Sequence, residues 1–129
     1  MSDLRPIGRA VMLDGAERHF LFTLNVVDEV QDHYDCSLEE VINKLTDKKE
    51  SIKALRYLTM ALLNDEAERN KRMKASVEYS TVTEADVGDM IGLDNYYEVM
   101  KALLKAYGIS MPEVDEDEDP NQKSGQMKS

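Results

Sequence analysis

The chain has 129 residues, a length that suits one domain of ordinary size. Its 26 acidic and 16 basic residues give a formal net charge of −10, which disfavours duplex DNA as a partner because phosphate contacts need a basic surface. A single cysteine excludes an internal disulfide and indicates a reducing compartment. No signal peptide and no apolar run of the ~18 residues of a membrane span is evident, so we expect a cytoplasmic protein that does not contact membranes.

The acidic charge is concentrated at the C-terminal end. The final twenty residues hold six acids, two lysines and only three large apolar side chains. Such a segment cannot bury enough apolar area to offset the entropy lost on ordering. We therefore expect a single globular helical domain with an N-terminal hairpin over residues 1–109 and a disordered acidic tail over residues 110–129.

The first elements in the chain are predicted to form a β-hairpin. Segments Arg9–Leu13 and Arg18–Leu24 flank Asp14-Gly15, a dipeptide that tolerates the positive φ angles of a tight two-residue turn. With a turn of this length, odd positions of the first strand share a face with even positions of the second. The resulting apolar face comprises Ile7, Val11, Leu13, Phe20, Phe22 and Leu24.

Two short helices are predicted next. Asn25 is expected to cap a helix that continues through Tyr34, with apolar side chains along one side. Ser37 and Glu40 have the spacing of a capping box at the start of the second helix. The apolar positions of this second helix follow the helical period at Leu38, Val41, Ile42 and Leu45.

A longer helix is predicted from about Lys48 to about Asp65, with room to continue through the charged residues that follow. One apolar stripe comprises Ile52, Leu55, Thr59, Leu62 and Leu63, and it is widened by Ala54, Leu58 and Ala61. Tyr57 and Met60 lie beyond that stripe. A helix this apolar around its circumference is either central in the fold or covered in part by another molecule.

The remaining elements are a short strand or loop at Val77–Thr81 and two further helices. Thr83 and Asp86 are expected to cap the first of these helices, and Gly92 is expected to end it. Asp94 is expected to cap the last helix, which Gly108 terminates. The apolar stripe of this last helix comprises Tyr96, Val99, Met100, Leu103, Leu104 and Tyr107.

The predicted fold class is therefore α+β and mainly α-helical, with an N-terminal β-hairpin followed by about five helices. No catalytic cluster is evident in the sequence. His33 and Cys36 are two candidate ligands where a zinc site needs at least three. The acids from Asp115 to Asp119 fail the calcium-loop pattern, because Pro120 stands where that loop requires glycine. We expect neither enzymatic activity nor a metal or cofactor.

A helix-turn-helix is the alternative interpretation of the last two helices. Glu84–Ile91 would be the first helix, Gly92 would lie in the turn, and Asn95–Tyr107 would be the recognition helix. The start of that helix carries Asp94 and Glu98. Two acids at the end of the helix that would contact DNA would repel its phosphates. This pattern favours a plain helical hairpin over a DNA-binding regulator.

Protein binding is the third interpretation. Tyr57, Met60 and Tyr97 lie outside the apolar stripes of their helices, and exposed Tyr and Met are frequent interface residues. Each of the three could equally be covered by a neighbouring helix. They are the candidate partner-binding residues.

The order of these elements resembles a known family. A short hairpin with the apolar second strand HFLFTLNVVDEV is followed by the capped helix SLEEVINKL and the apolar helix IKALRYLTMALLND. After a charged break come TVTEADVGDMIGLDNYYEVMKALLKAYG and an acidic tail. From Pro6 to Tyr107 this arrangement resembles the small tail assembly chaperones of long-tailed bacteriophages and prophages, especially those of Gram-positive hosts.

The resemblance implies a role in virion morphogenesis. Members of the family bind the long helical tape measure protein, keep it soluble, and help recruit tail tube subunits before they leave the finished tail. The resemblance also implies self-association, and in many members a second, longer form made by a ribosomal frameshift. The family has no catalytic motif, so no residue role follows from it.

Overall fold

The computed structural model describes residues 7–108 of the chain. The predicted acidic tail, residues 110–129, lies outside the described residues. The elements in chain order are β1 (Arg9–Leu13), β2 (Ala16–Phe20), α1 (Leu24–Tyr34), α2 (Leu38–Asn43), a 3₁₀ turn (Lys44–Thr46), α3 (Ser51–Arg72), α4 (Glu84–Met90) and α5 (Tyr96–Tyr107). The prediction of an α+β, mainly helical fold with an N-terminal hairpin followed by five helices is confirmed.

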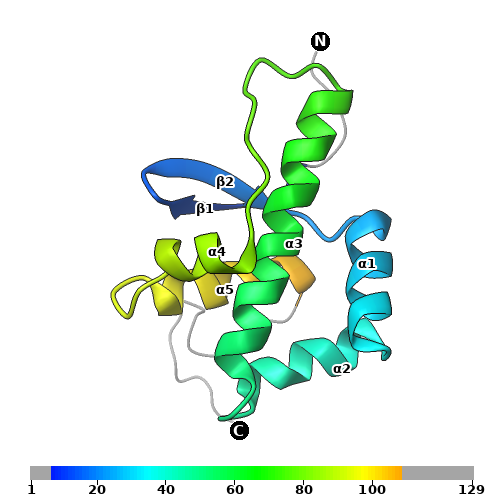
Figure 1. The fold of residues 1–129 in the computed structure, drawn as a ribbon, viewed down its shortest axis with the longest axis vertical. Coiled ribbons are helices and arrows are strands. Elements are labelled where there is room, and N and C mark those ends of the chain that lie inside the picture. The colour runs from blue at the N-terminus through cyan, green and yellow to red at the C-terminus, as the bar shows by residue number, and fades with distance from the viewer. Residues whose placement is uncertain (1–6, 109–129) are drawn as a thin grey trace, which may run out of the picture.

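Helix α3 is the central element of the described chain (Figure 1). Helices α1 and α2 lie to one side of it, and the hairpin, α4 and α5 lie to the other. The C-terminal part of α3 extends beyond α4 and α5, and the loop that follows it runs back along the helix toward α4. Its 22 residues span about 33 Å at 1.5 Å per residue.

The core forms around α3, which contacts β2, α1, α4 and the 3₁₀ turn, while α5 packs on the hairpin. The fully buried large side chains of α3 include Leu55, Leu58, Leu62 and Leu63, and they belong to one buried cluster with Phe20 from β2, Val30 from α1, Val41 from α2, Val87 from α4 and Leu103 from α5. Ile52 was expected on the buried stripe, but it is exposed. It lies in the first turn of α3, where the helix borders an open groove near Ile91 and Leu93.

The hairpin has the predicted two-residue turn. Asp14 and Gly15 both have positive φ, and Leu13 pairs with Ala16. The same-face prediction is correct for Val11, Leu13 and Phe20, which are buried. It is wrong for Ile7 and Leu24, which are exposed, because the strands begin at Arg9 and end at Phe20 and the alternation stops there.

The start of α1 differs from the prediction by two residues. Thr23, rather than Asn25, has extended backbone angles, and its Oγ1 accepts a hydrogen bond from the Val26 amide at 3.2 Å. The same hydroxyl donates to Asp65 Oδ2 of α3 at 3.1 Å. This one side chain therefore caps α1 and joins it to α3.

The other predicted helix ends are largely confirmed. Capping boxes are present at Ser37–Glu40 and at Thr83–Asp86, and Gly108 ends α5 with φ of 99°. The link from α4 to α5 differs, because α4 ends at Met90 and α5 is preceded by Asn95 rather than capped by Asp94. Asn95 accepts from the Gly92 amide at 2.7 Å and donates to the Met90 carbonyl at 3.1 Å, which holds the link closed.

The two candidate caps of α1 give the first prediction. We expect Thr23→Ala to lower the free energy of unfolding by about 1 kcal/mol or more, because the variant loses both the cap and the bond to Asp65. The matched change Asn25→Ala should cost less than about 0.5 kcal/mol. Urea denaturation followed by circular dichroism measures both, and a larger loss for Asn25→Ala would show that the cap is assigned to the wrong residue.

Candidate functional site

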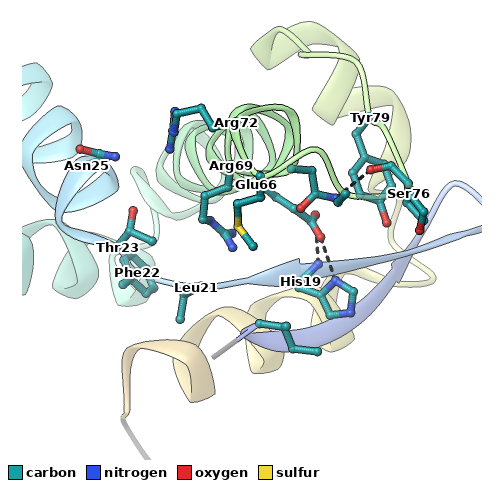
Figure 2. A pocket seen from close by; sticks show the side chains of 15 residues that line it. His19, Leu21, Phe22, Thr23, Asn25, Glu66, Arg69, Arg72, Ser76 and Tyr79 are labelled. Atoms are coloured by element: carbon teal, nitrogen blue, oxygen red, sulfur yellow. Dashed lines mark hydrogen bonds and ion pairs between the residues drawn. The ribbon is translucent and has the colours of Figure 1, made fainter. Parts of the chain in front are cut away.

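A cavity of about 620 Å³ opens beside the C-terminal half of α3 (Figure 2). Its walls are the segment that joins β2 to α1, the last turns of α3, and the loop after α3. We call it the cleft. Its apolar lining consists of Ile7, Leu21, Phe22, Met73, Ala75 and Val77, and its polar and aromatic lining includes His19, Thr23, Glu66, Arg69, Arg72 and Tyr79.

A buried ion pair fixes β2 against α3 at one end of the cleft. Arg18 Nε lies 2.8 Å from Glu66 Oε1, and both residues are buried. The other Arg18 nitrogen, Nη2, donates to the Leu63 carbonyl at 3.2 Å. Glu66 also accepts from the His19 amide at 3.2 Å, and its Oε2 lies 2.8 Å from His19 Nδ1 (Figure 2). These bonds satisfy both charges, which would otherwise be costly to bury.

The loop after α3 is held by side-chain bonds to helix and strand. The Tyr79 ring lies 3.7 Å from the Arg18 guanidinium carbon, and its hydroxyl donates to the Glu17 carbonyl at 3.0 Å. Asn70 donates to the Val77 carbonyl at 3.0 Å. The apolar side chain of Val77 is thus presented at the cleft by a loop with defined contacts.

A second charged group borders the other side of the cleft. Arg69 Nε lies 3.1 Å from Asp65 Oδ2, which also accepts from Thr23. The terminal nitrogen Nη2 of Arg69 is buried and has no hydrogen-bond partner among the residues that the structure describes. A buried donor without an acceptor costs free energy, and this one belongs to a residue that lines the cleft.

Exposed apolar side chains gather at the rim of the cleft. Ile7, Met73 and Val77 are among the exposed large apolar residues of the described chain, and all three line the cleft. Leu24, at 85% exposure, stands between Thr23 and Asn25, two more lining residues. Scattered apolar residues are normal on protein surfaces, but a group around a concave site indicates a binding surface.

Tyr57 is the candidate residue that a neighbouring helix covers. It lies outside the apolar stripe of α3, but only 6% of it is exposed. Its ring stacks on His33 at 3.9 Å between ring centroids and meets the edge of Tyr34 at 5.4 Å. Of the two alternatives for Tyr57, a partner-binding surface or cover by a neighbouring helix, the structure shows the cover, because α1 packs on this face of α3. Burial, followed by the nearby Glu29 carboxylate, raises the pKa of Tyr57 to about 12.

The other two candidate residues lie apart from the cleft. Met60 is half-buried against the core, and Tyr97 on α5 is 48% exposed with the Lys101 ammonium 5.1 Å from its ring centroid. None of the three candidates lines the cleft. Binding of a partner by these residues stays a prediction, although only Tyr97 presents a largely accessible ring.

The sequence analysis did not identify Arg18 and Glu66 as a buried pair, although the sequence contains a signal for both residues. Arg18 has the same strand parity as Phe20, so the hairpin pattern places it on the buried face. Glu66 continues the stripe of α3 at the next helical position after Thr59 and Leu62. A charge on each of two apolar faces that meet is the pattern expected of a buried ion pair.

The remaining motifs form no metal or membrane site in the described part of the chain. His33 stacks on Tyr57. Cys36, three residues after His33, is half-buried. Within residues 7–108 there is no group of three or more His, Cys, Asp or Glu side chains placed to hold a metal ion. Across the same residues, no helix combines the length and the apolar character that crossing a membrane requires.

Comparisons with models of known protein families, with curated proteins and with solved structures give no match. The function is therefore inferred from the cleft and its surroundings.

The burial of Tyr57 gives the second prediction. Its folded-state pKa of about 12 lies above the ordinary value of 10.0, so the neutral phenol's contribution to stability is complete below pH 10 and is lost as the pH rises through about 12. An absorbance titration at the tyrosinate band should show, in the wild type but not in Tyr57→Phe, a step centred near pH 12. If the step that Tyr57→Phe removes is centred near pH 10 instead, the ring is in water and the prediction is wrong.

Proposed function

We propose that this chain is a phage tail assembly chaperone, which binds an amphipathic helical segment of the tape measure protein in the cleft. The cleft carries the proposal, because apolar side chains from three segments line it together with the cationic side chains of Arg69 and Arg72. The order of elements from Pro6 to Tyr107, which resembles that family, supports the same role. Binding rather than catalysis is the activity we propose.

The chemistry of the cleft suits the apolar face of a helix. Leu21 and Phe22, which are half-buried, line it together with the exposed side chains of Met73 and Val77. An apolar stripe of a partner helix would cover these side chains, as in helix-in-groove recognition. Met73 suits such a site because methionine adapts to partners of different shape. The exposed guanidinium of Arg72, which also lines the cleft, can bond an acceptor on the partner and fix the orientation of the helix.

A tape measure protein requires this kind of cover. Its long helices expose apolar faces that aggregate until they are buried. Several copies of a small chaperone can cover a long target, and weak individual contacts allow tail tube subunits to displace them. Self-association of the chain would hold neighbouring copies in place along the target.

Nothing in the geometry of α4 and α5 favours the DNA-binding alternative. Asp94 and Glu98 are both exposed at the start of α5, where a recognition helix would approach phosphates.

Co-expression with a candidate tape measure protein tests the proposal. The wild-type chain should raise the soluble fraction of that protein, and Met73→Asp with Val77→Asp should abolish the gain, because each change puts a charge on the apolar edge of the cleft. Met12→Asp is the matched control, since Met12 is also an exposed methionine but lies on β1 outside the cleft. For purified proteins we expect the paired change to weaken Kd at least tenfold, or about 1.4 kcal/mol.

Equal solubilisation by the paired variant and the wild type would contradict the assignment of the cleft. No solubilisation by the wild type would contradict the chaperone function. A gel shift with nonspecific duplex DNA at low salt separates the alternative, because a DNA-binding regulator would shift the duplex and we expect no shift.

A further inference from the structure

The chain leaves the described structure beside the floor of the cleft. Tyr107, the last residue of α5, makes an edge-to-face ring contact with Phe22 at 5.9 Å between centroids, and Phe22 lines the cleft. Gly108 follows with φ of 99° and ends the helix. The segment that begins at residue 109 therefore starts next to the apolar side chains of the cleft.

The composition of that segment changes along its length. Ile109, Met111 and Val114 are apolar, and they alternate with small or polar residues. An unbroken acidic run follows from Asp115 to Asp119. An apolar stretch thus comes first after α5, and a strongly negative stretch comes next.

The cleft presents the complementary features in the same order. Its floor near Tyr107 is apolar, and the end of α3 beyond it is basic, with Arg69, Lys71 and Arg72 in the last turn and Lys74 just after. Lys71, Arg72 and Lys74 are exposed, and the buried Nη2 of Arg69 lacks a partner among residues 7–108. In a chain of net charge −10, this group is a local concentration of positive charge.

The length of the segment is sufficient. Glu113 is the fifth residue after Gly108, which allows a reach of up to about 17 Å, and the chain from Glu113 to Asp119 extends up to about 20 Å further. The last two turns of α3 span only about 11 Å. A carboxylate on the exposed Arg72 would form a charge-assisted bond, and the exposed Lys71 and Lys74 would add attraction that salt screens.

We propose that residues 109–119 of the same chain dock in the cleft, with Ile109, Met111 and Val114 on its apolar floor and the acids of 115–119 against the basic end of α3. The segment is then an intramolecular occupant that a partner helix must displace. This regulatory consequence, unlike the docking itself, rests on the proposed function. An occupant present nine-tenths of the time would weaken the apparent affinity for a partner about tenfold.

Amide NMR spectra of the full-length chain test the docking without any partner. One variant replaces the acids of residues 115–119 by Asn or Gln, and a control replaces Lys123 and Lys128 by Gln, which also changes the charge of the tail. The acid variant should shift the amides of Leu21, Phe22 and residues 69–74, and the control should leave them in place. High salt should produce the same shifts in the wild type.

A reciprocal pair of variants tests the other side of the contact. Arg72→Gln with Lys74→Gln should shift the amides of residues 115–119, and Lys48→Gln with Lys49→Gln, an exposed basic pair before α3, should not. Shifts confined to the tail, or located near Lys48 instead of the cleft, would overturn the proposal. Shifts that vanish on dilution would overturn it too, because they would assign the cleft to the tail of a second copy.

A negative result in these spectra leaves the chaperone assay unaffected, and a negative chaperone assay leaves the spectra unaffected, so the two failures are distinguishable. If the segment docks in the cleft and the chain is also a chaperone, the variant without the acids of residues 115–119 should bind the tape measure protein several-fold more tightly than the wild type.

Discussion

The buried ion pair between Arg18 and Glu66 is the contact on which the rest of the structure depends. A two-stranded hairpin has little stability of its own and needs an element to pack against. Phe20 anchors the hairpin in the core, and Arg18 joins β2 to α3 through Glu66 and the Leu63 carbonyl. Removing either partner would leave a buried charge without compensation, which is far more costly than losing a surface pair.

The same pair determines the shape of the cleft. It holds β2 against α3, and the chain from Leu21 to Thr23 that follows β2 forms one wall of the cleft beside the last turns of the helix. The third wall contacts the pair as well, because Tyr79 packs on the Arg18 guanidinium. Just after α3, the apolar side chains of Met73 and Val77 are exposed at the cleft, where a partner or the chain's own tail can cover them.

Features with a local cause could be predicted from the sequence. The Asp14-Gly15 turn depends on two residues, and the two capping boxes depend on residues three apart, so each was visible as a short motif. Local sequence alone could not decide whether Thr23 or Asn25 caps α1. Both residues can cap a helix, and the selection of Thr23 agrees with its second bond, to Asp65 on α3.

Features that arise from packing between distant segments could not be predicted in the same way. Tyr57 stood outside the apolar stripe of its own helix, and only the position of α1 shows that it is covered. The cleft joins segments that are about fifty residues apart in sequence, so no single stretch of sequence indicates it. Glu66 was detectable in principle from the helical period, because it continues a stripe that is otherwise buried.

The most direct measurement of the central claim compares Glu66→Gln with Glu68→Gln, an exposed neighbour on the same helix. Equilibrium unfolding in urea, combined with amide hydrogen exchange, reports both the total and the local loss of stability. We expect Glu66→Gln to cost about 3–5 kcal/mol and to remove protection first in β2 and in the loop around Tyr79. Glu68→Gln should cost less than about 0.5 kcal/mol. Equal small losses for the two variants, with the hairpin still protected, would contradict the claim that this pair holds the cleft together.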